Sequence, residues 1–227
     1  MAFGILDILS GLQGGFSAVA TDGYTPITYP LSLPSFPGFT RVSIRADVST
    51  AVAMSAFTYQ TQLQRHAGER WVASISLPRM TRENAEEWIS FLLMLNGPYG
   101  TFLLGDPQGE TPRGTVVGTP KVLGSGQVGH ILVTDGWASG SFGVLRAGDW
   151  IQIGQRMYKV LRDVDSNSDG QATLDIWPRL RESPGNAELI ITSSCKGIFR
   201  LASPQYELWD VGIDGLYTLT LSAVEAV

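Results

Sequence analysis

Apolar and polar residues alternate along the first half of the chain in short stretches. Over residues 41–48 an apolar residue stands at every second position, beginning with Val42. Strict alternation of this kind is typical of a strand with one buried face. Residues 57–63 and 71–77 are rich in aromatic and β-branched residues and predict two further strands. The turn-prone residues Ala67-Gly68-Glu69 are expected to precede the last of these strands.

Residues 82–96 carry the pattern of one amphipathic helix. Thr81 is its predicted N-cap, and acidic residues in the first turns suit the positive end of the helix dipole. The apolar stripe consists of Ala85, Trp88, Ile89, Leu92, Leu93 and Leu95. Asn96-Gly97-Pro98 ends the helix, and residues 99–104 are predicted to continue as a strand. The helix is therefore expected to cover one face of a sheet.

After Pro112 the pattern changes to many short strands between glycine-bearing turns. A tight hairpin is predicted around Gly154-Gln155, and strands of this spacing without a helix favour a small closed barrel. Alternation returns over residues 217–223, and this last strand is expected to complete the first sheet. The predicted organisation is an N-terminal extension or arm at 1–28, a hub domain at 29–112 plus 200–227, and an inserted barrel at 113–199. Residues 1–24 fit either an arm on a neighbouring subunit or a short helix on their own domain.

The composition narrows the possible functions. The net charge is −5 and only 16% of the residues are charged, without a basic stripe for nucleic acid or a lipid surface. No apolar run is long enough to predict a membrane span. Cys195 is the only cysteine, which excludes an internal disulfide and suits assembly in a reducing cytoplasm. A structural role for this thiol is favoured over a nucleophilic one.

One loop resembles part of a calcium-binding sequence. Asp165, Asn167 and Asp169 stand at the spacing of the first three ligands of such a loop, followed by Gly170. The twelfth position, which should be a bidentate Glu, is Ile176. The same residue types are favoured in any long polar turn. A polar turn is the preferred interpretation, and a weak cation site is the alternative.

No catalytic constellation is recognisable in the sequence. Glu69, Asp106 and Glu110 are acids near turns, but nothing marks two of them as partners in glycoside hydrolysis. His66 and His130 are far apart in the sequence. No nucleophile elbow, phosphate-binding loop or dinucleotide-binding motif occurs. The chain is therefore predicted not to be an enzyme and to need no cofactor.

Several blocks of the chain, in this order and spacing, resemble one family. They are YPLSLP at 29–34, WISFLLMLNGPYGTFLLGDP at 88–107, RAGDWIQIG at 146–154, YKVL at 158–161, IWPRLR at 176–181, GIFRLAS at 197–203 and LSAVE at 221–225. Together they resemble minor tail proteins of siphophages, of the distal tail protein type. The resemblance covers residues 29 to the end, and residues 1–28 take no part in it.

The resemblance implies an all-β fold with one flanking α-helix. Its hub would be a β-sandwich or barrel like that of tail-tube subunits, with an inserted small β-barrel of OB or galectin type. It also implies a homohexameric ring at the tip of the virion tail, assembled in the host cytoplasm. Such a ring joins the tail tube protein to hub, tip and fibre proteins, with the tape measure protein as a further possible partner. The family supplies no catalytic residues.

Two other functions stay open at the level of the sequence. In the first, the inserted barrel binds a receptor or carbohydrate, for which the six tryptophans could supply aromatic surfaces, although packing is the favoured role for them. In the second, the protein is a tail-associated hydrolase that uses one or two of its loop acids.

Overall fold

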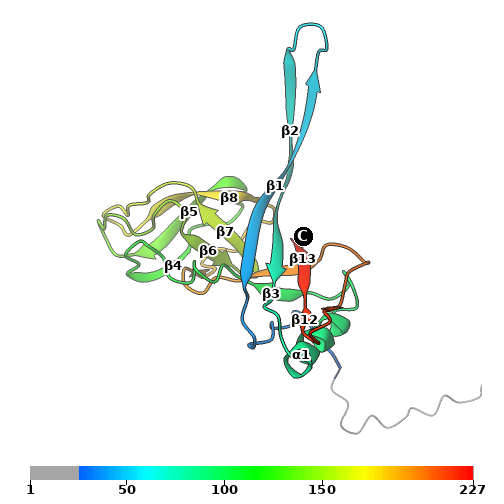
Figure 1. Cartoon of the computed structure of the whole chain (residues 1–227). Coiled ribbons are helices and arrows are strands. Elements are labelled where there is room, and N and C mark those ends of the chain that lie inside the picture. Colours follow the sequence, from blue (N-terminus) through cyan, green and yellow to red (C-terminus); the bar gives the residue numbers. More distant parts are fainter. Residues whose placement is uncertain (1–25, 227) are drawn as a thin grey trace, which may run out of the picture.

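The computed structural model describes residues 26–226, and these form a mostly β structure with one flanking helix (Figure 1). The predicted fold class is confirmed. The elements are β1 (Arg41–Met54), β2 (Thr61–Ser76), α1 (Arg82–Met94), β3 (Phe102–Leu104), β4 (Gly118–Val122), β5 (Gly129–Trp137), β6 (Trp150–Ile153), β7 (Arg156–Val160), β8 (Ala172–Leu180), β9 (Ile190–Ile191), β10 (Gly197–Leu201), β11 (Asp210–Val211), β12 (Tyr217–Thr218) and β13 (Thr220–Glu225). Residues 1–25, on which most of the predicted N-terminal extension falls, lie outside the described part of the chain.

The first sheet, here called the hub sheet, joins strands from both ends of the described chain. Its strand order is β1-β2-β13-β10-β3, and all neighbouring strands are antiparallel. The last strand, β13, pairs with β2 through Leu221 and Ile75 and with β10 through Ala223 and Leu201. Pairing of the C-terminal strand with the first sheet is what the alternation near the end of the chain predicted.

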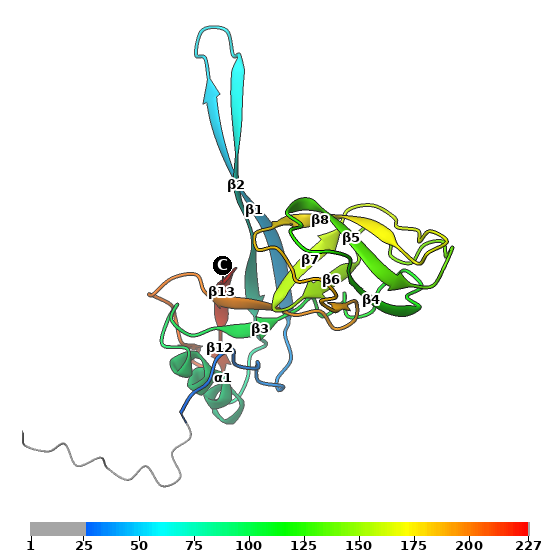
Figure 2. The same cartoon turned by 180° about the vertical axis from the view of Figure 1, so that it is seen from behind.

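The second sheet forms a small barrel beside the hub sheet (Figure 2). Its order is β4-β5-β8-β7-β6-β9. A bridge between Lys121 of β4 and Leu189, the residue before β9, connects the two sides of the sheet and so nearly closes the barrel. The predicted hairpin is present, since β6 and β7 pair from Trp150↔Lys159 to Ile153↔Arg156, with Gly154 at φ +56° in its turn. A left-handed φ of this kind is what glycine supplies at no steric cost.

Helix α1 covers the hub core with the predicted stripe, apart from one position. Trp88 is fully buried and packs edge-on against Phe91, which in turn contacts Phe102 of β3. Leu93, expected in the stripe, is 56% exposed, and Phe91 is buried instead. Thr81 occupies the N-cap position, but its side chain makes no capping hydrogen bond. Within residues 26–226, no helix combines the length and apolar character needed to cross a membrane.

The strands predicted for residues 41–77 were wrong in the middle of this range. The structure forms one long hairpin from β1 and β2, and residues 55–60 make its turn. Phe57 and Tyr59, which predicted a strand of their own, lie in that turn. The predicted turn around Gly68 is instead an irregularity inside β2, where residues 66–68 face only Ser49 across the ladder. Glycine in a strand often marks such a bulge, because it disturbs pairing without ending the strand.

Candidate functional site

The outer half of the long hairpin projects away from the other strands of the hub sheet and from the barrel (Figures 1 and 2). We call residues 48–64 the arm, which is a different segment from the predicted N-terminal extension at 1–28. No charged residue occurs between Asp47 and Arg65, and every arm residue except Ser55 is exposed. The absence of charge over this stretch is the sequence signal by which the arm could have been found. Because the stretch is rich in Ser, Ala, Thr and Gln, a search for apolar periodicity does not detect it.

The two faces of the arm differ in chemistry. Residues directly opposite one another in an antiparallel pair lie on the same face. Val52 pairs with Leu63 and Met54 with Thr61, whereas Ala51 and Ala53 pair with Gln64 and Gln62. One face is therefore apolar, with Val52, Met54 and Leu63 exposed by 65%, 62% and 69%. The other face is small and polar but uncharged.

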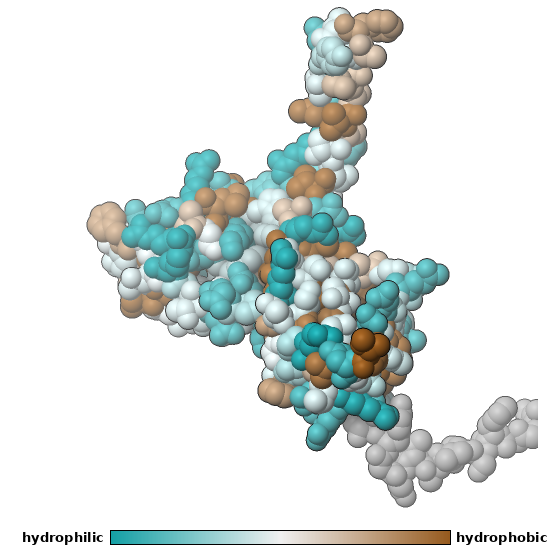
Figure 3. Space-filling model, in the orientation of Figure 1, coloured by the Kyte–Doolittle hydropathy of each residue, from teal (hydrophilic) through white to brown (hydrophobic). Residues whose placement is uncertain are grey.

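The apolar face of the arm continues the core-facing side of the hub sheet. Val42 and Ile44 in the inner part of β1 pack on the hub core, and the same alternation leads outward to Val52 and Met54. At the end of the arm, Phe57 is 96% and Tyr59 75% exposed. Brown and pale side chains accordingly alternate along the arm in the space-filling view (Figure 3). A protruding apolar surface of this kind makes the arm a candidate site of association.

Both long edges of the arm are open within the described structure. β1 pairs only with β2, and the other edge of β2 meets β13 only from Val72 to Ser76. The arm therefore presents unpaired backbone groups on its two sides, which are sites where further strands can add. A two-stranded hairpin is only marginally stable by itself in water. Open edges, an apolar face and missing charge together favour a partner along the arm.

The base of the hairpin is fixed to the barrel by tryptophan packing. The Trp71 ring lies 4.9 Å from that of Trp150 and 4.3 Å from that of Trp177, measured between centroids. The Trp71 indole nitrogen donates to the Met157 carbonyl oxygen at 3.0 Å. Its backbone N–H donates to Glu225 at 3.1 Å, and Arg181 contacts the same carboxylate oxygen at 3.2 Å. These contacts tie β2 to three barrel strands and to β13.

A buried carboxylate adds a second set of contacts at the same junction. Glu69 accepts a hydrogen bond from the Arg179 backbone N–H at 2.9 Å and forms an ion pair with Arg65. Nδ1 of His130 lies 3.0 Å from the Ile176 carbonyl oxygen, which makes Nδ1 the donor. Nε2 of the same ring lies 2.9 Å from Arg65 and 3.5 Å from Glu69.

The electrostatics of Glu69 favour its ionised form. Burial acts to raise the pKa of this carboxyl, because it removes water from the charge. The hydrogen bonds from Arg65 and the Arg179 backbone act in the opposite direction, as do the charges of His130 and Arg65. Their sum lowers the pKa of Glu69 below its ordinary value of 4.5. The junction therefore depends on an ionised carboxylate.

A groove of about 790 Å³ runs between the inner part of β1 and the barrel. Trp71, Trp150 and Lys159 line it together with Asp106 and the start of β1. The Lys159 ammonium lies 3.9 Å from the centroid of the Trp150 ring, a cation–π arrangement. Asp106 accepts a hydrogen bond from the Trp150 indole at 3.0 Å. The groove thus combines an aromatic wall with a positive charge.

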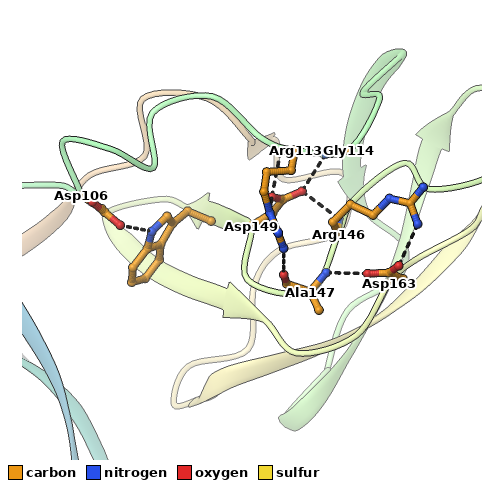
Figure 4. A network of polar contacts seen from close by, with 8 residues as sticks. Asp106, Arg113, Gly114, Arg146, Ala147, Asp149 and Asp163 are labelled. Atoms are coloured by element: carbon orange, nitrogen blue, oxygen red, sulfur yellow. Dashed lines mark hydrogen bonds and ion pairs between the residues drawn. The ribbon is translucent and has the colours of Figure 1, made fainter.

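A network beside the groove organises the loops that lead into the barrel (Figure 4). The buried Asp149 carboxylate accepts the backbone N–H groups of Arg113, Gly114 and Arg146 at 2.9, 3.0 and 2.8 Å. Asp163 accepts the Ala147 N–H at 2.8 Å and the Arg146 guanidinium at 2.7 Å. These acids satisfy backbone donors and have a structural role.

Two residues of the calcium-like loop accept backbone hydrogen bonds, Asp165 from a neighbouring loop and Asn167 within the turn. The Asp165 side chain accepts the Gly143 N–H at 2.6 Å. The Asn167 side-chain oxygen accepts the N–H groups of Asp169 and Gln171 at 2.9 and 2.8 Å. Backbone bonds of this kind are the usual function of Asp and Asn in turns. Among residues 26–226, no three His, Cys, Asp or Glu side chains are grouped so that they could hold a metal ion.

The remaining candidate residues lie in different surroundings. Glu69 belongs to the junction, whereas Asp106 and Glu110 both line a smaller pocket of about 230 Å³. His130 is at the junction, while His66 lies in the irregular part of β2. Burial raises the pKa of the Cys195 thiol to about 11, so the thiol stays protonated at neutral pH.

Neither protein-family models nor curated proteins give a match to this sequence.

Proposed function

We propose that this protein is a structural virion component that forms a ring at the distal end of a long non-contractile phage tail. The single observation that carries the proposal is the arm, which is exposed on both faces and open along both edges. No contact within the described subunit accounts for such a surface, and it is suited to contacts between copies. The location of the ring at the tail tip is inferred from the resemblance to distal tail proteins.

The two edges of the arm differ, which suits a closed ring. One edge belongs to β1 and runs the whole length of the hairpin, while the other belongs to the outer part of β2. Contact between unlike surfaces of successive copies is heterologous, and it closes into a ring when the rotation between copies fits. The uncharged arm favours this contact, because no like charges oppose the approach of the next copy.

The partners of the ring follow from the resemblance. Copies of the chain would form a homohexamer between the tail tube protein and the hub, tip and fibre proteins, with the tape measure protein as a further partner. Sugar binding by the barrel gains no support from its three tryptophans. Trp137 and Trp150 are buried and their indole nitrogens donate to Thr134 and Asp106, and the ring of Trp177 packs against Trp71.

The proposal is tested by the mass of the purified protein in solution and by negative-stain images of the same sample. We expect a particle of about six copies with a central hole, at a size that is unchanged by moderate salt because the arm is uncharged. A protein that remains monomeric at all concentrations, and also in the presence of purified tail tubes, would contradict the proposal.

A further inference from the structure

The groove between β1 and the barrel has features of a binding site that the ring proposal does not use. Its wall includes the apolar residues Phe39, Val42, Ile44 and Trp71. It also follows the start of β1, whose outer edge pairs with no strand of the described structure. An apolar groove next to an open strand edge can accept a length of polypeptide through backbone and side-chain contacts together.

Three charged residues line this groove, the cations Arg41 and Lys159 and the acid Asp106, so the charged lining has one positive charge in excess. Arg41 and Lys159 both line it, and neither forms an ion pair within residues 26–226. Burial lowers the pKa of Lys159, while the nearby Asp106 and Asp149 carboxylates act to raise it. An occupant with apolar side chains and an acid would complement both the wall and the charges.

The chain carries a segment of that chemistry ahead of the described residues. Residues 3–12 read FGILDILSGL, with six large apolar residues and one acid, Asp7. No Lys or Arg occurs before Arg41. The described chain begins at Pro26 and reaches the groove at Gly38. Fourteen residues from 12 to 26 can span up to roughly 45 Å.

We propose that residues 3–12 dock in the groove between β1 and the barrel, with their apolar side chains on its wall and Asp7 near Lys159. The segment covers apolar surface of the junction and holds the barrel against the hub sheet. This inference does not rest on the ring, because the segment can come from the same copy or from its neighbour.

Disulfide trapping in the full-length chain tests the docking. In a Cys195→Ser background, Ile8→Cys is combined with Gln108→Cys, an exposed position on the groove wall, or with Val128→Cys, an exposed control on the barrel that does not line the groove. In a glutathione redox buffer we expect the pair with position 108 to close at least tenfold more readily. A crosslink within one chain or between two chains supports docking equally and identifies the source of the segment. Equal closure at both positions would overturn the proposal.

A charge exchange gives a second, independent readout. Lys159→Glu should reduce the crosslink at position 108 several-fold, and adding Asp7→Lys should restore most of it. Loss without recovery would show that Lys159 acts on folding and not on the segment, and would overturn the assigned charge contact.

Hydrogen exchange provides a measurement without introduced cysteines. Ile8→Asp with Leu9→Asp in the full chain should speed exchange of the outer-edge amides of residues 41–48, whereas Ser17→Asp should leave them unchanged. Exchange unaffected by the first pair would contradict docking. These three experiments report only on the groove. Docking can therefore be disproved while the particle mass still shows a ring, and docking can be supported while no ring is found.

Discussion

The inner and outer halves of the long hairpin are made from the same two strands but meet opposite surroundings. From Glu69 to Ile75, every second residue of β2 is buried, and β13 and the barrel cover that part of the hairpin. From Thr61 to Gly68, the residues of β2 are all exposed. The inner half is held by contacts inside the subunit, so its side chains are explained by packing. The arm, residues 48–64, has no such packing within the described structure.

The two halves also differ in how they use charge. The junction contains Glu69 and Glu225, which are both buried and paired with arginines, and it connects strands far apart in the sequence. The arm contains no charge at all. Such contacts favour one geometry, because a buried carboxylate left without its partners would be costly. An uncharged apolar face is less selective in orientation and suits a contact that forms after folding.

The largest effect expected for a single substitution is at the junction. Trp71→Ala should lower the free energy of unfolding by about 3–5 kcal/mol, since it removes a buried ring that packs on two others. Tyr59→Ala, in the exposed end of the arm, is the matched control and should change stability by less than about 0.5 kcal/mol. Chemical denaturation measures both. Similar losses of stability for the two variants would contradict the proposed difference between the two halves of the hairpin.

Removal of the junction charge should have a smaller effect. Glu69→Gln keeps the shape of the side chain but weakens its charged hydrogen bonds, which should cost about 1.5–3 kcal/mol of stability. Glu87→Gln on the exposed side of α1 should be nearly neutral. A neutral result for Glu69→Gln in the same denaturation experiment would mean that the carboxylate does not hold the barrel.

The same carboxylate predicts a pH dependence. Because the pKa of Glu69 is lowered in the folded protein, its contribution is present above the ordinary value of 4.5 and is lost as the pH falls through the folded value. The stability difference between the wild type and Glu69→Gln should therefore shrink between pH 7 and pH 3. A difference that stays constant or grows on acidification would contradict the assigned direction.

The smallest effect is expected at the calcium-like loop. Millimolar calcium should shift the melting temperature of the chelator-treated protein by less than about 1 °C, whereas a site saturated 100-fold above its Kd would add about 2.7 kcal/mol and several degrees. The reason is that Asp165 and Asn167 already bind backbone N–H groups. A rise in melting temperature that Asp165→Asn removes would instead establish a cation site.

Local patterns predicted most of the fold and little of the site. The helix, the barrel hairpin and the return of the last strand follow from spacing and turn residues that act over short distances. The hairpin was misread because Phe57 and Tyr59 have strand character but sit in its turn, and Gly68 has turn character but sits in a bulge. The junction could not be predicted, because it depends on contacts such as Arg179 with Glu69, 110 residues apart, and Met157 with Trp71, 86 residues apart.

The most direct test of the assembly surface compares the two faces of the arm. Val52→Ser, Met54→Ser and Leu63→Ser together remove the apolar face, and Ala51→Ser, Ala53→Ser and Gln62→Ser alter the opposite face at neighbouring positions. Light scattering over a range of concentrations measures the mass of each variant and of the wild type. We predict that the first variant loses the ring and becomes a folded monomer, while the second assembles like the wild type. Assembly that survives loss of the apolar face, or that both variants lose equally, would contradict the account.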